Sequence, residues 1–160
     1  MNQIASLLCP EHIRLDLDIS DKNRVFAEAG RIFADHVGLD AASVAESLAA
    51  RESLGSTALG QGIAFPHARI KGLREPLAAF MRLRQPLPFD APDGNPVAEL
   101  FVLLVPQQAT EAHLQLLAEA AQMFGDLYFH DHLRRQKDVD GVYQAFADWP
   151  TMATRESSES

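Results

Sequence analysis

The chain has 160 residues, 47% of them hydrophobic and 22% charged, a composition typical of one globular domain with a buried core. Its formal net charge of −8 argues against electrostatic binding to nucleic acid or to an anionic membrane. The single cysteine, Cys9, has no partner for an internal disulfide, and no signal peptide or transmembrane-length apolar run is recognisable. We therefore expect a cytoplasmic protein that does not insert into a membrane.

The first forty residues predict a short helix, a strand and a longer helix. Residues 1–9 are apolar enough for one or two helical turns, which end at Pro10, and the alternation of apolar residues over 12–17 predicts a strand. Ser20 is the expected N-cap of the next helix. That helix carries apolar residues at helical spacing and ends at Gly38.

The next helix, which begins after Asp40, carries an arginine on its apolar side. Val44, Leu48 and Arg51 lie at positions i, i+4 and i+7, so they share one face. An arginine in this place either extends into solvent from the helix end or points toward a site formed by the residues that follow. Its planar fork of donors suits phosphate oxygens, and on spacing alone both interpretations stay open.

Residues 60–69, Gly-Gln-Gly-Ile-Ala-Phe-Pro-His-Ala-Arg, are the most informative stretch of the chain. Gly60 and Gly62 can adopt backbone angles closed to other residues, which permits a sharp turn or a close approach. Pro66 fixes its own φ and biases the preceding residue toward an extended backbone, so we expect His67 at the end of a short strand. One imidazole nitrogen can act as a nucleophile while a hydrogen bond holds the other. Taken alone, such a residue is more often an ordinary loop histidine.

The second half of the chain predicts two strands and three helices. The alternating run 77–83 is typical of a half-buried strand, 90–96 is a turn cluster, and the continuous apolar run 100–105 predicts a central strand buried on both faces. Three helices follow: one after Thr110 with Leu114, Leu117, Ala121 and Phe124 turned inward, one over 126–136, and one after Asp138 that stops at Pro150.

These elements indicate the α/β (α+β) class, with a mixed β-sheet flanked by helices. No composition shift or linker divides the chain, so we expect one domain over 1–150. Residues 151–160 are polar and rich in serine, which predicts a disordered C-terminal tail.

Histidines near the C-terminal helices are further candidates. His113 falls in the first turn after Thr110, where free amides and the helix dipole favour an anion and a neutral imidazole. A solvated histidine is the commoner case there, but a neutral His113 can donate a hydrogen bond to His67 or to an anion beside it. His130 and His132 would point more than a right angle apart on a helix and have no third ligand nearby, so we expect no metal site.

Residues 52–69, Glu-Ser-Leu-Gly-Ser-Thr-Ala-Leu-Gly-Gln-Gly-Ile-Ala-Phe-Pro-His-Ala-Arg, resemble the active-site signature of enzyme IIA proteins of the bacterial phosphotransferase system. The resemblance is greatest to the fructose/mannitol class, and within it to the stand-alone nitrogen-regulatory IIA. Similar residues continue in 88–90, 100–106 and 113–114, so the resemblance covers about residues 3–147. Ala68 stands where many relatives have glycine, which affects only the local turn.

The resemblance implies a fold like that of mannitol-specific IIA and the function of a phosphoryl carrier. It implies that the phosphocarrier HPr, or its nitrogen-branch relative NPr, gives a phosphoryl group to Nε2 of His67 while a backbone carbonyl holds Nδ1. Arg51 and His113 are then the expected phosphate-stabilising residues, because transfer between two histidines needs in-line approach and positive or dipolar groups around the equatorial oxygens. Supporting positions are Ser56, Thr57, Gly60 and Gly62. No cofactor is expected, and the sequence has no P-loop.

Two outputs are consistent with such a carrier. In a nitrogen-regulatory IIA the phosphorylation state changes which target proteins are bound, whereas in a sugar-transport IIA the group passes to a separate IIB protein. We favour the regulator, because the whole chain resembles that type, and expect a phosphotransferase that turns over no small molecule by itself. The rivals are a binding domain that is never phosphorylated and, more weakly, a hydrolase or metalloenzyme.

Overall fold

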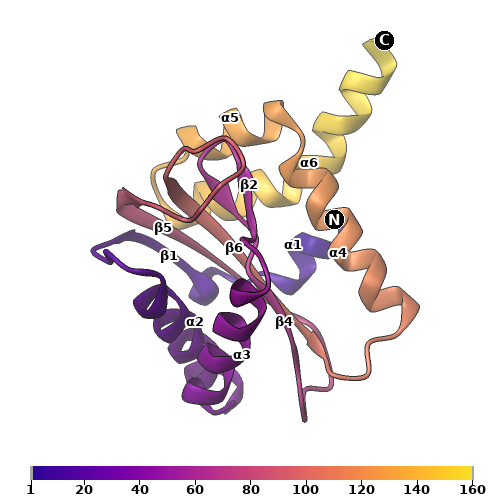
Figure 1. Ribbon diagram of the computed structural model, residues 1–160. Helices are drawn as coiled ribbons and strands as arrows, with labels where there is room; N and C mark the ends of the chain where they lie inside the picture. Colours follow the sequence, from indigo (N-terminus) through magenta and orange to yellow (C-terminus); the bar gives the residue numbers. More distant parts are fainter. Residues whose placement is uncertain (1, 160) are drawn as a thin grey trace.

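The computed structural model describes residues 2–159, apart from the side chains of 36, 37 and 150–159. In chain order (Figure 1) the elements are α1 (Gln3–Leu7), the 3-10 turn η1 (Pro10–His12), β1 (Ile13–Leu17), α2 (Lys22–Val37), α3 (Ala41–Ser53), β2 (Ala58–Gly60), β3 (Ile63–Ala64), β4 (His67–Ile70), β5 (Leu77–Leu87), β6 (Val97–Pro106), α4 (Glu111–Phe124), α5 (Leu127–Arg135) and α6 (Val139–Glu159). Within the described residues, no helix has the length and apolar character needed to cross a membrane.

A mixed sheet of six strands forms the centre of the molecule, in the order β1-β5-β6-β3-β2, with β4 also paired to β6. Strand β6 runs antiparallel to β5 and parallel to both β3 and β4. Every residue of β6 except Ala98 is buried. The predicted central strand, buried on both faces, is thereby confirmed.

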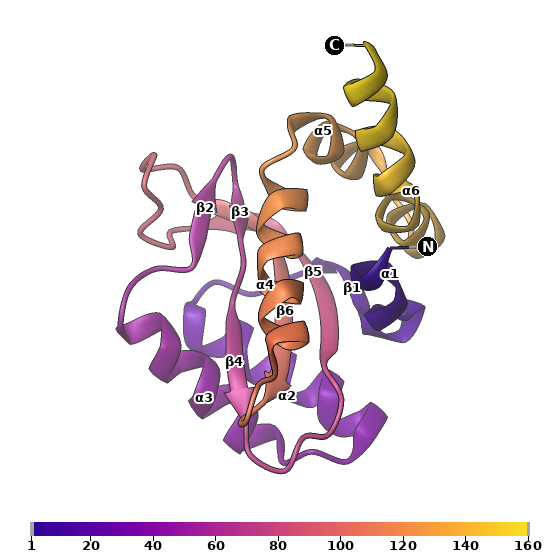
Figure 2. The same cartoon turned by 90° about the vertical axis from the view of Figure 1, so that its right-hand side faces the viewer.

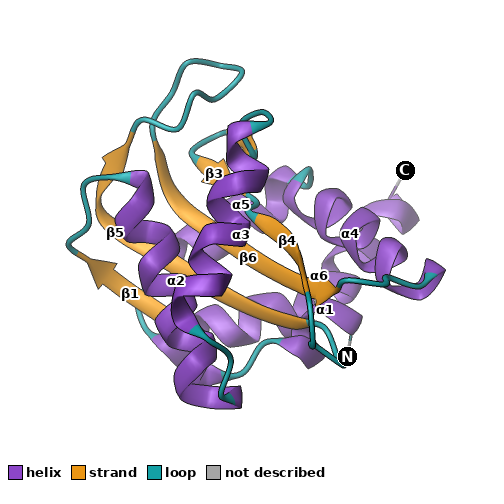
Figure 3. Cartoon of the chain, turned by 60° about the horizontal axis from the view of Figure 1, so that its bottom comes forward, coloured by secondary structure: helices purple, strands orange, loops and turns teal. Residues whose placement is uncertain are grey.

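Helices cover both faces of this sheet, as the sequence predicts. Along β6, Phe101, Leu103 and Val105 pack into one apolar cluster with α1, α4, α5 and α6, whereas the alternating Leu100, Val102 and Leu104 pack into a second cluster with α2 and α3. The two-residue period of a strand produces this division, because successive side chains point to opposite faces. Figure 3 shows α2 and α3 across one face, and Figure 2 shows α4 crossing β6 on the other.

The predicted helix boundaries hold at some ends and fail at others. Gly38 ends α2 in the left-handed conformation, with φ 75°, and the Asp40 side chain caps α3 by accepting from the Ser43 amide. The N-cap of α2 is Asp21 rather than the predicted Ser20. The Asp21 carboxylate accepts from the Arg24 amide at 2.9 Å, since it stands three residues before that amide, the usual spacing of an N-cap contact.

The buried face of α4 also differs from the prediction. Leu114, expected to point inward, is 44% exposed, and Ala121 is exposed as well. The buried residues of α4 are Leu116, Ala120, Met123 and Phe124. Both sets have helical spacing, because α4 carries apolar residues on more than one side. Periodicity therefore identified the helix, and packing against the sheet selected the face.

The C-terminal helix is longer than the sequence predicts. The sequence predicts that the proline at 150 stops it, but the backbone of α6 continues as a helix to Glu159. Met152, Ala153, Arg155 and Glu156 are good helix formers, and their propensity favours continuation despite the lost backbone donor and the threonines and serines among them. The single domain over 1–150 and the disordered tail over 151–160 stay predictions.

Helices α2 and α3 approach each other closely at Gly30. A Cβ placed on Gly30 would lie 3.1 Å from the carbonyl carbon of Ala41 and closer still to its oxygen. Both are backbone atoms at the start of α3, so no side-chain rotation relieves the contact. We expect Gly30→Ala to lower the free energy of unfolding by about 1–3 kcal/mol, as overpacking does, although alanine is the better helix former.

Chemical denaturation measures this difference. Asn23→Ala on the exposed part of α2 is the matched control, because it changes helix propensity without entering the contact with α3, and we expect it to leave stability unchanged or slightly raised. A stabilising effect of Gly30→Ala would contradict the close packing of α2 against α3.

Candidate functional site

His67 is the first residue of β4, immediately after Pro66. The sequence placed it at the end of a strand; the structure instead starts a new strand there, because β3 ends at Ala64 and the proline separates the two. The Pro66 carbonyl accepts a hydrogen bond from the Leu103 amide at 3.0 Å, and His67 itself is paired with Leu103 of β6. The histidine backbone is thus held by the central strand of the sheet.

The imidazole of His67 is oriented by one hydrogen bond. Its Nδ1 lies 2.9 Å from the carbonyl oxygen of Phe65, and the two rings pack with their centroids 5.0 Å apart. A carbonyl oxygen only accepts, so Nδ1 carries the proton. In the neutral ring Nε2 then keeps its lone pair. This is the hydrogen bond that the sequence resemblance implies.

The surroundings of His67 favour its neutral form. Burial lowers the pKa of the imidazole below its ordinary value, and this effect exceeds the opposing one of the hydrogen bond to the Phe65 carbonyl. The positive charge of Arg51 lowers the pKa further, and the negative charge of Glu52 raises it. A neutral imidazole at physiological pH is the nucleophilic form. Local structure therefore supplies both the lone pair on Nε2 and the protonation state that keeps it available.

Arg51 lies in the same pocket as His67, in the last turn of α3. Its Nη1 donates to the Gly55 carbonyl at 2.9 Å, so the loop after α3 holds the guanidinium in place. Of the two interpretations left open by the sequence, the structure supports the one in which this arginine faces a site. A bound anion in the pocket would meet the remaining guanidinium donors.

The pocket has a volume of about 490 Å³ and is contributed by four elements. Its lining residues are Ser47, Ala50, Arg51 and Leu54 at α3, His67, Ala68 and Arg69 on β4, Val105 on β6 and Leu117 on α4. Sequence reasoning missed Arg69. Since side chains two residues apart on a strand point the same way, the spacing of His67 and Arg69 carried the signal that both reach one face of β4.

Gly60 and Gly62 do not line this pocket. They form the turn between β2 and β3, with φ 92° and 79°, and the Gln61 amide between them donates to Asp93 at 2.9 Å. Ile63 pairs with Glu99 of β6, whereas His67 pairs with Leu103, four residues further along. At the rise of a strand this separates the turn from His67 by about 13 Å. The structure therefore gives these amides no place in the lining of the His67 pocket, and their contribution to a phosphate site stays a prediction.

Ser56 and Thr57 also lie outside the pocket lining. The Ser56 hydroxyl donates to the Phe89 carbonyl, and the buried Thr57 bonds through its amide and hydroxyl to the Glu52 carboxylate. Both residues thus shape the loop after α3 through hydrogen bonds that are already formed within the protein.

His113 lines a second, separate pocket. Its Nδ1 accepts from the Thr110 amide at 3.1 Å, and its own amide donates to the Thr110 hydroxyl at 3.3 Å, a reciprocal cap at the start of α4. That pocket, of about 410 Å³, is formed with Gly72, Leu73, Arg74, Pro106, Gln107 and Gln108. Leu117, one helical turn further along α4, belongs to the His67 pocket, so His113 lies near its border. A direct role for His113 at His67 stays a prediction.

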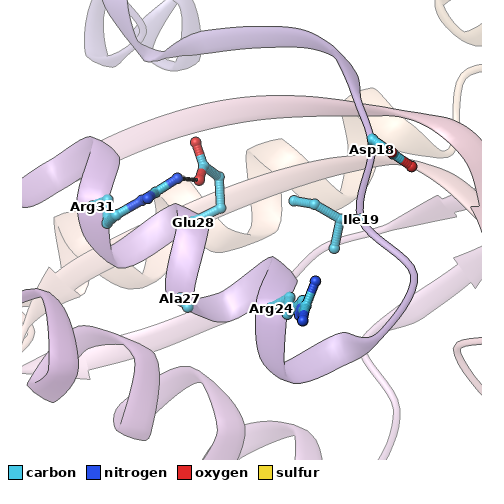
Figure 4. A pocket seen from close by; sticks show the side chains of 6 residues that line it. All are labelled: Asp18, Ile19, Arg24, Ala27, Glu28 and Arg31. Carbon is cyan, nitrogen blue, oxygen red and sulfur yellow. Dashed lines mark hydrogen bonds and ion pairs between the residues drawn. The ribbon is translucent and has the colours of Figure 1, made fainter.

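In the part of the chain that the structure describes, other polar groups do not form a comparable site. His130 is buried, with Nε2 bonded to the Phe124 carbonyl. Among the residues that the structure describes, no three His, Cys, Asp or Glu side chains are grouped to hold a metal ion. Figure 4 shows a pocket of about 330 Å³ beside α2, in which Arg31 is paired with Glu28. Its lining contains no histidine, cysteine or hydroxyl side chain.

Residues 6–149 match the model of the family described as "Phosphoenolpyruvate-dependent sugar phosphotransferase system, EIIA 2". The chain belongs to this family. It is therefore a phosphoryl-transfer component of the phosphotransferase system, whose IIA proteins exchange a phosphoryl group with partner proteins of that system.

Curated relatives include nitrogen regulatory proteins. The one from Pseudomonas aeruginosa is 40% identical over 149 residues, which are 92% of this chain and 97% of the relative. The one from Bradyrhizobium diazoefficiens is 35% identical over 150 residues, 94% of this chain and 98% of the relative. The EIIA protein is thus a homologue of nitrogen regulatory IIA proteins along almost its whole length.

Solved structures agree with this placement. Nitrogen regulatory protein IIA-Ntr from Neisseria meningitidis has a TM-score of 0.84 and 42% identity, over 90% of this chain and 99% of that one. IIA mannitol from Escherichia coli, at 19% identity, has a TM-score of 0.70 over 86% of this chain and 96% of that one, which supports the fold alone. The predicted family and the predicted fold are both confirmed.

The charges and the burial around His67 predict how its imidazole titrates with pH. We expect the His67 imidazole to titrate with a midpoint below the ordinary value of 6.5, because burial disfavours the imidazolium. Arg51→Gln removes the positive charge that lowers this pKa, so the midpoint rises toward the ordinary value. NMR of the His67 ring resonances against pH measures both midpoints.

Arg31→Gln is the control for this titration, since Arg31 is paired with Glu28 and does not line the His67 pocket. We expect it to leave the His67 midpoint unchanged. An equal midpoint in wild type and Arg51→Gln would show that the guanidinium does not act on the ring.

Proposed function

We propose that this EIIA protein accepts a phosphoryl group on Nε2 of His67 from a phosphohistidine carrier of the HPr or NPr type, and that its phosphorylation state changes which proteins it binds. The observation that carries the first part is the hydrogen bond from Nδ1 to the Phe65 carbonyl, 2.9 Å long. It leaves Nε2 as the nucleophilic ring nitrogen in a neutral imidazole.

The transfer is an exchange between two imidazoles. The Nε2 lone pair of His67 attacks the phosphorus of the donor phosphohistidine, a new N–P bond forms, and the electron pair of the old N–P bond returns to the donor ring. The main requirement of such a step is to stabilise the negative charge on the three equatorial oxygens, and guanidinium groups can do this. Arg51 and Arg69 line the same pocket as His67 and supply that positive charge. His113 assists from the pocket border through its Nε2.

The regulatory output is supported by the extent of the similarity. The nitrogen regulatory protein of Pseudomonas aeruginosa is matched over 97% of its length, whereas the fructose-specific EIIABC component of Bacillus subtilis is matched over only 21%. A phosphoryl group adds roughly −1.5 to −2 charges at neutral pH. At a pocket lined by two arginines, this charge changes the surface that a partner meets.

Phosphoenolpyruvate with the upstream carrier proteins tests the acceptor. We expect the wild-type protein to gain an acid-labile phosphoryl label and His67→Ala to gain none. Arg51→Lys keeps the charge but loses the two-pronged donor geometry, so we expect labelling to slow about tenfold while the fold is retained.

His132→Ala is the matched control, because it removes a histidine on α5 that does not line the pocket. It is expected to label like wild type. A phosphoryl label that persists in His67→Ala would exclude this assignment of the acceptor.

Affinity capture tests the regulatory output. Unmodified and phosphorylated protein serve as baits in a cell extract, and we expect them to retain different sets of partners, because the added charge repels some contacts and recruits arginine- or lysine-rich ones. Identical sets, together with rapid passage of the group to a sugar-specific IIB protein, would support the alternative of a transport subunit. His67→Ala, as a third bait that cannot carry the group, should match the unmodified protein.

A further inference from the structure

A buried carboxylate lies beside the site without touching its pocket. Glu52 follows Arg51 on α3, is only 9% exposed and does not line the His67 pocket. A buried carboxylate is costly unless hydrogen bonds and an opposite charge compensate it. Here Oε1 accepts from the Thr57 amide at 3.1 Å and from its hydroxyl at 2.7 Å, while Oε2 forms an ion pair with Lys22 at 2.9 Å.

Backbone hydrogen bonds connect this carboxylate to the imidazole. Glu52 holds Thr57, the Thr57 carbonyl accepts from the Phe65 amide at 2.9 Å, and the Phe65 carbonyl accepts from Nδ1 of His67 at 2.9 Å. On the other side, the Pro66 carbonyl is held by β6. Residues 65–67, which orient the ring, are therefore held by hydrogen bonds on two sides. Glu52 is the last residue in the series of bonds on one of these sides.

The same carboxylate fixes the loop that holds Arg51. Residues 54–57 leave α3 and return to the sheet at β2, and the Gly55 carbonyl in this loop accepts from the Arg51 guanidinium. Bonding of Glu52 to Thr57 closes the loop at its far end. The position of the Glu52 carboxylate thus also determines where the Gly55 carbonyl lies.

Segments from two other parts of the chain secure this arrangement. Lys22, at the start of α2, contacts Asp90 at 3.4 Å as well as Glu52, and its ammonium lies 4.5 Å from the centroid of the Phe89 ring. The Ser56 hydroxyl donates to the Phe89 carbonyl. The negative charge of Glu52 is balanced by Lys22, so it does not confront an incoming phosphoryl group as an isolated anion.

We propose that Glu52 is a positioning residue for phosphoryl transfer, which acts through Thr57 and Phe65 to keep Nδ1 of His67 bonded and Nε2 aimed at the pocket. The proposal deepens the proposed function and rests on it. Glu52 touches no reacting atom. Its effect on the rate comes from geometry, and a displacement of about 1 Å at a reacting group can cost up to 10²-fold in rate.

Three variants remove different parts of this chain of contacts. Glu52→Ala removes all of them. Glu52→Gln keeps an oxygen that accepts the two Thr57 bonds of Oε1, and it loses the ion pair and the longer 3.4 Å contact of Oε2 with the Thr57 amide, so it is the conservative rescue. Thr57→Val keeps the shape and the amide of Thr57 but loses the 2.7 Å hydroxyl bond.

Glu99→Gln is the matched control. The Glu99 side chain is 5% exposed, against 6% for Glu52, and pairs with Arg82 at 2.9 Å. Its loss disturbs a buried ion pair of the same kind on β6, outside the His67 pocket.

Two readouts are measured for each variant: the ¹⁵N shifts of the His67 ring, which report its tautomer, and the rate of labelling from phosphoenolpyruvate and the upstream carriers. We expect Glu52→Ala to lose the pure Nδ1–H tautomer and to label at least about tenfold more slowly. Thr57→Val should change the tautomer and the labelling rate in the same direction as Glu52→Ala does, but by a smaller amount. Glu52→Gln should stay within about threefold of the wild-type rate, and Glu99→Gln should keep the wild-type tautomer and rate.

Wild-type tautomer and rate in Glu52→Ala would overturn the proposal, and so would an equal loss in Glu99→Gln. If Glu52→Ala does not fold, Thr57→Val decides, and unchanged readouts in that variant contradict the role. If the upstream carriers do not label even the wild type, the proposed function fails, while the tautomer still tests whether Glu52 orients the ring.

Discussion

The site depends on one hydrogen bond, from Nδ1 of His67 to the carbonyl of the residue two positions earlier. It exists because Phe65 is held extended by the following proline and because Pro66 and His67 are bonded to β6. The bond settles which ring nitrogen carries the proton, and burial settles that the ring is neutral. In the proposed function, a common side chain thereby acts as a directed nucleophile without a separate general base.

The charges around His67 differ from those of the chain as a whole. The sequence carries a net charge of −8, yet Arg51 and Arg69 both line the pocket. Their positive charge favours an anion at the site, and the charge of Arg51 also lowers the pKa of the imidazole. In the proposed function, the charge of Arg51 therefore contributes both to binding of the phosphoryl group and, after burial, to the neutral state of the acceptor ring. The buried pair of Glu52 and Lys22 supports this arrangement without cancelling it.

Sequence reasoning reached the parts of the structure that depend on local rules. The Asp40 cap, the left-handed Gly38 and the buried run of β6 each follow from the chemistry of a few adjacent residues. His67 and Arg51 are candidate site residues from the sequence because proline, glycine and helical spacing restrict where a side chain can point. The family resemblance then gave these residues a role that local rules alone left open.

The remaining differences between the sequence predictions and the structure arise where contacts between distant segments determine the arrangement. The buried face of α4 is chosen by contact with the sheet, and sequence periodicity permits either of its apolar stripes. The turn at Gly60 lies away from the His67 pocket because β3 and β4 pair with different parts of β6, a register that no local pattern encodes. His113 bonds to its own helix cap. The contacts of Glu52, from which its positioning role is proposed, form only once α2, α3 and the 88–90 loop come together.

The position of the phosphoryl group on the His67 ring tests this account most directly. ¹⁵N and ³¹P NMR of the protein phosphorylated by its upstream carriers distinguish attachment at Nε2 from attachment at Nδ1. The account predicts attachment at Nε2, with the proton retained on Nδ1 and bonded to the Phe65 carbonyl. A phosphoryl group on Nδ1 would require that hydrogen bond to break, and would contradict the claim that it directs the site.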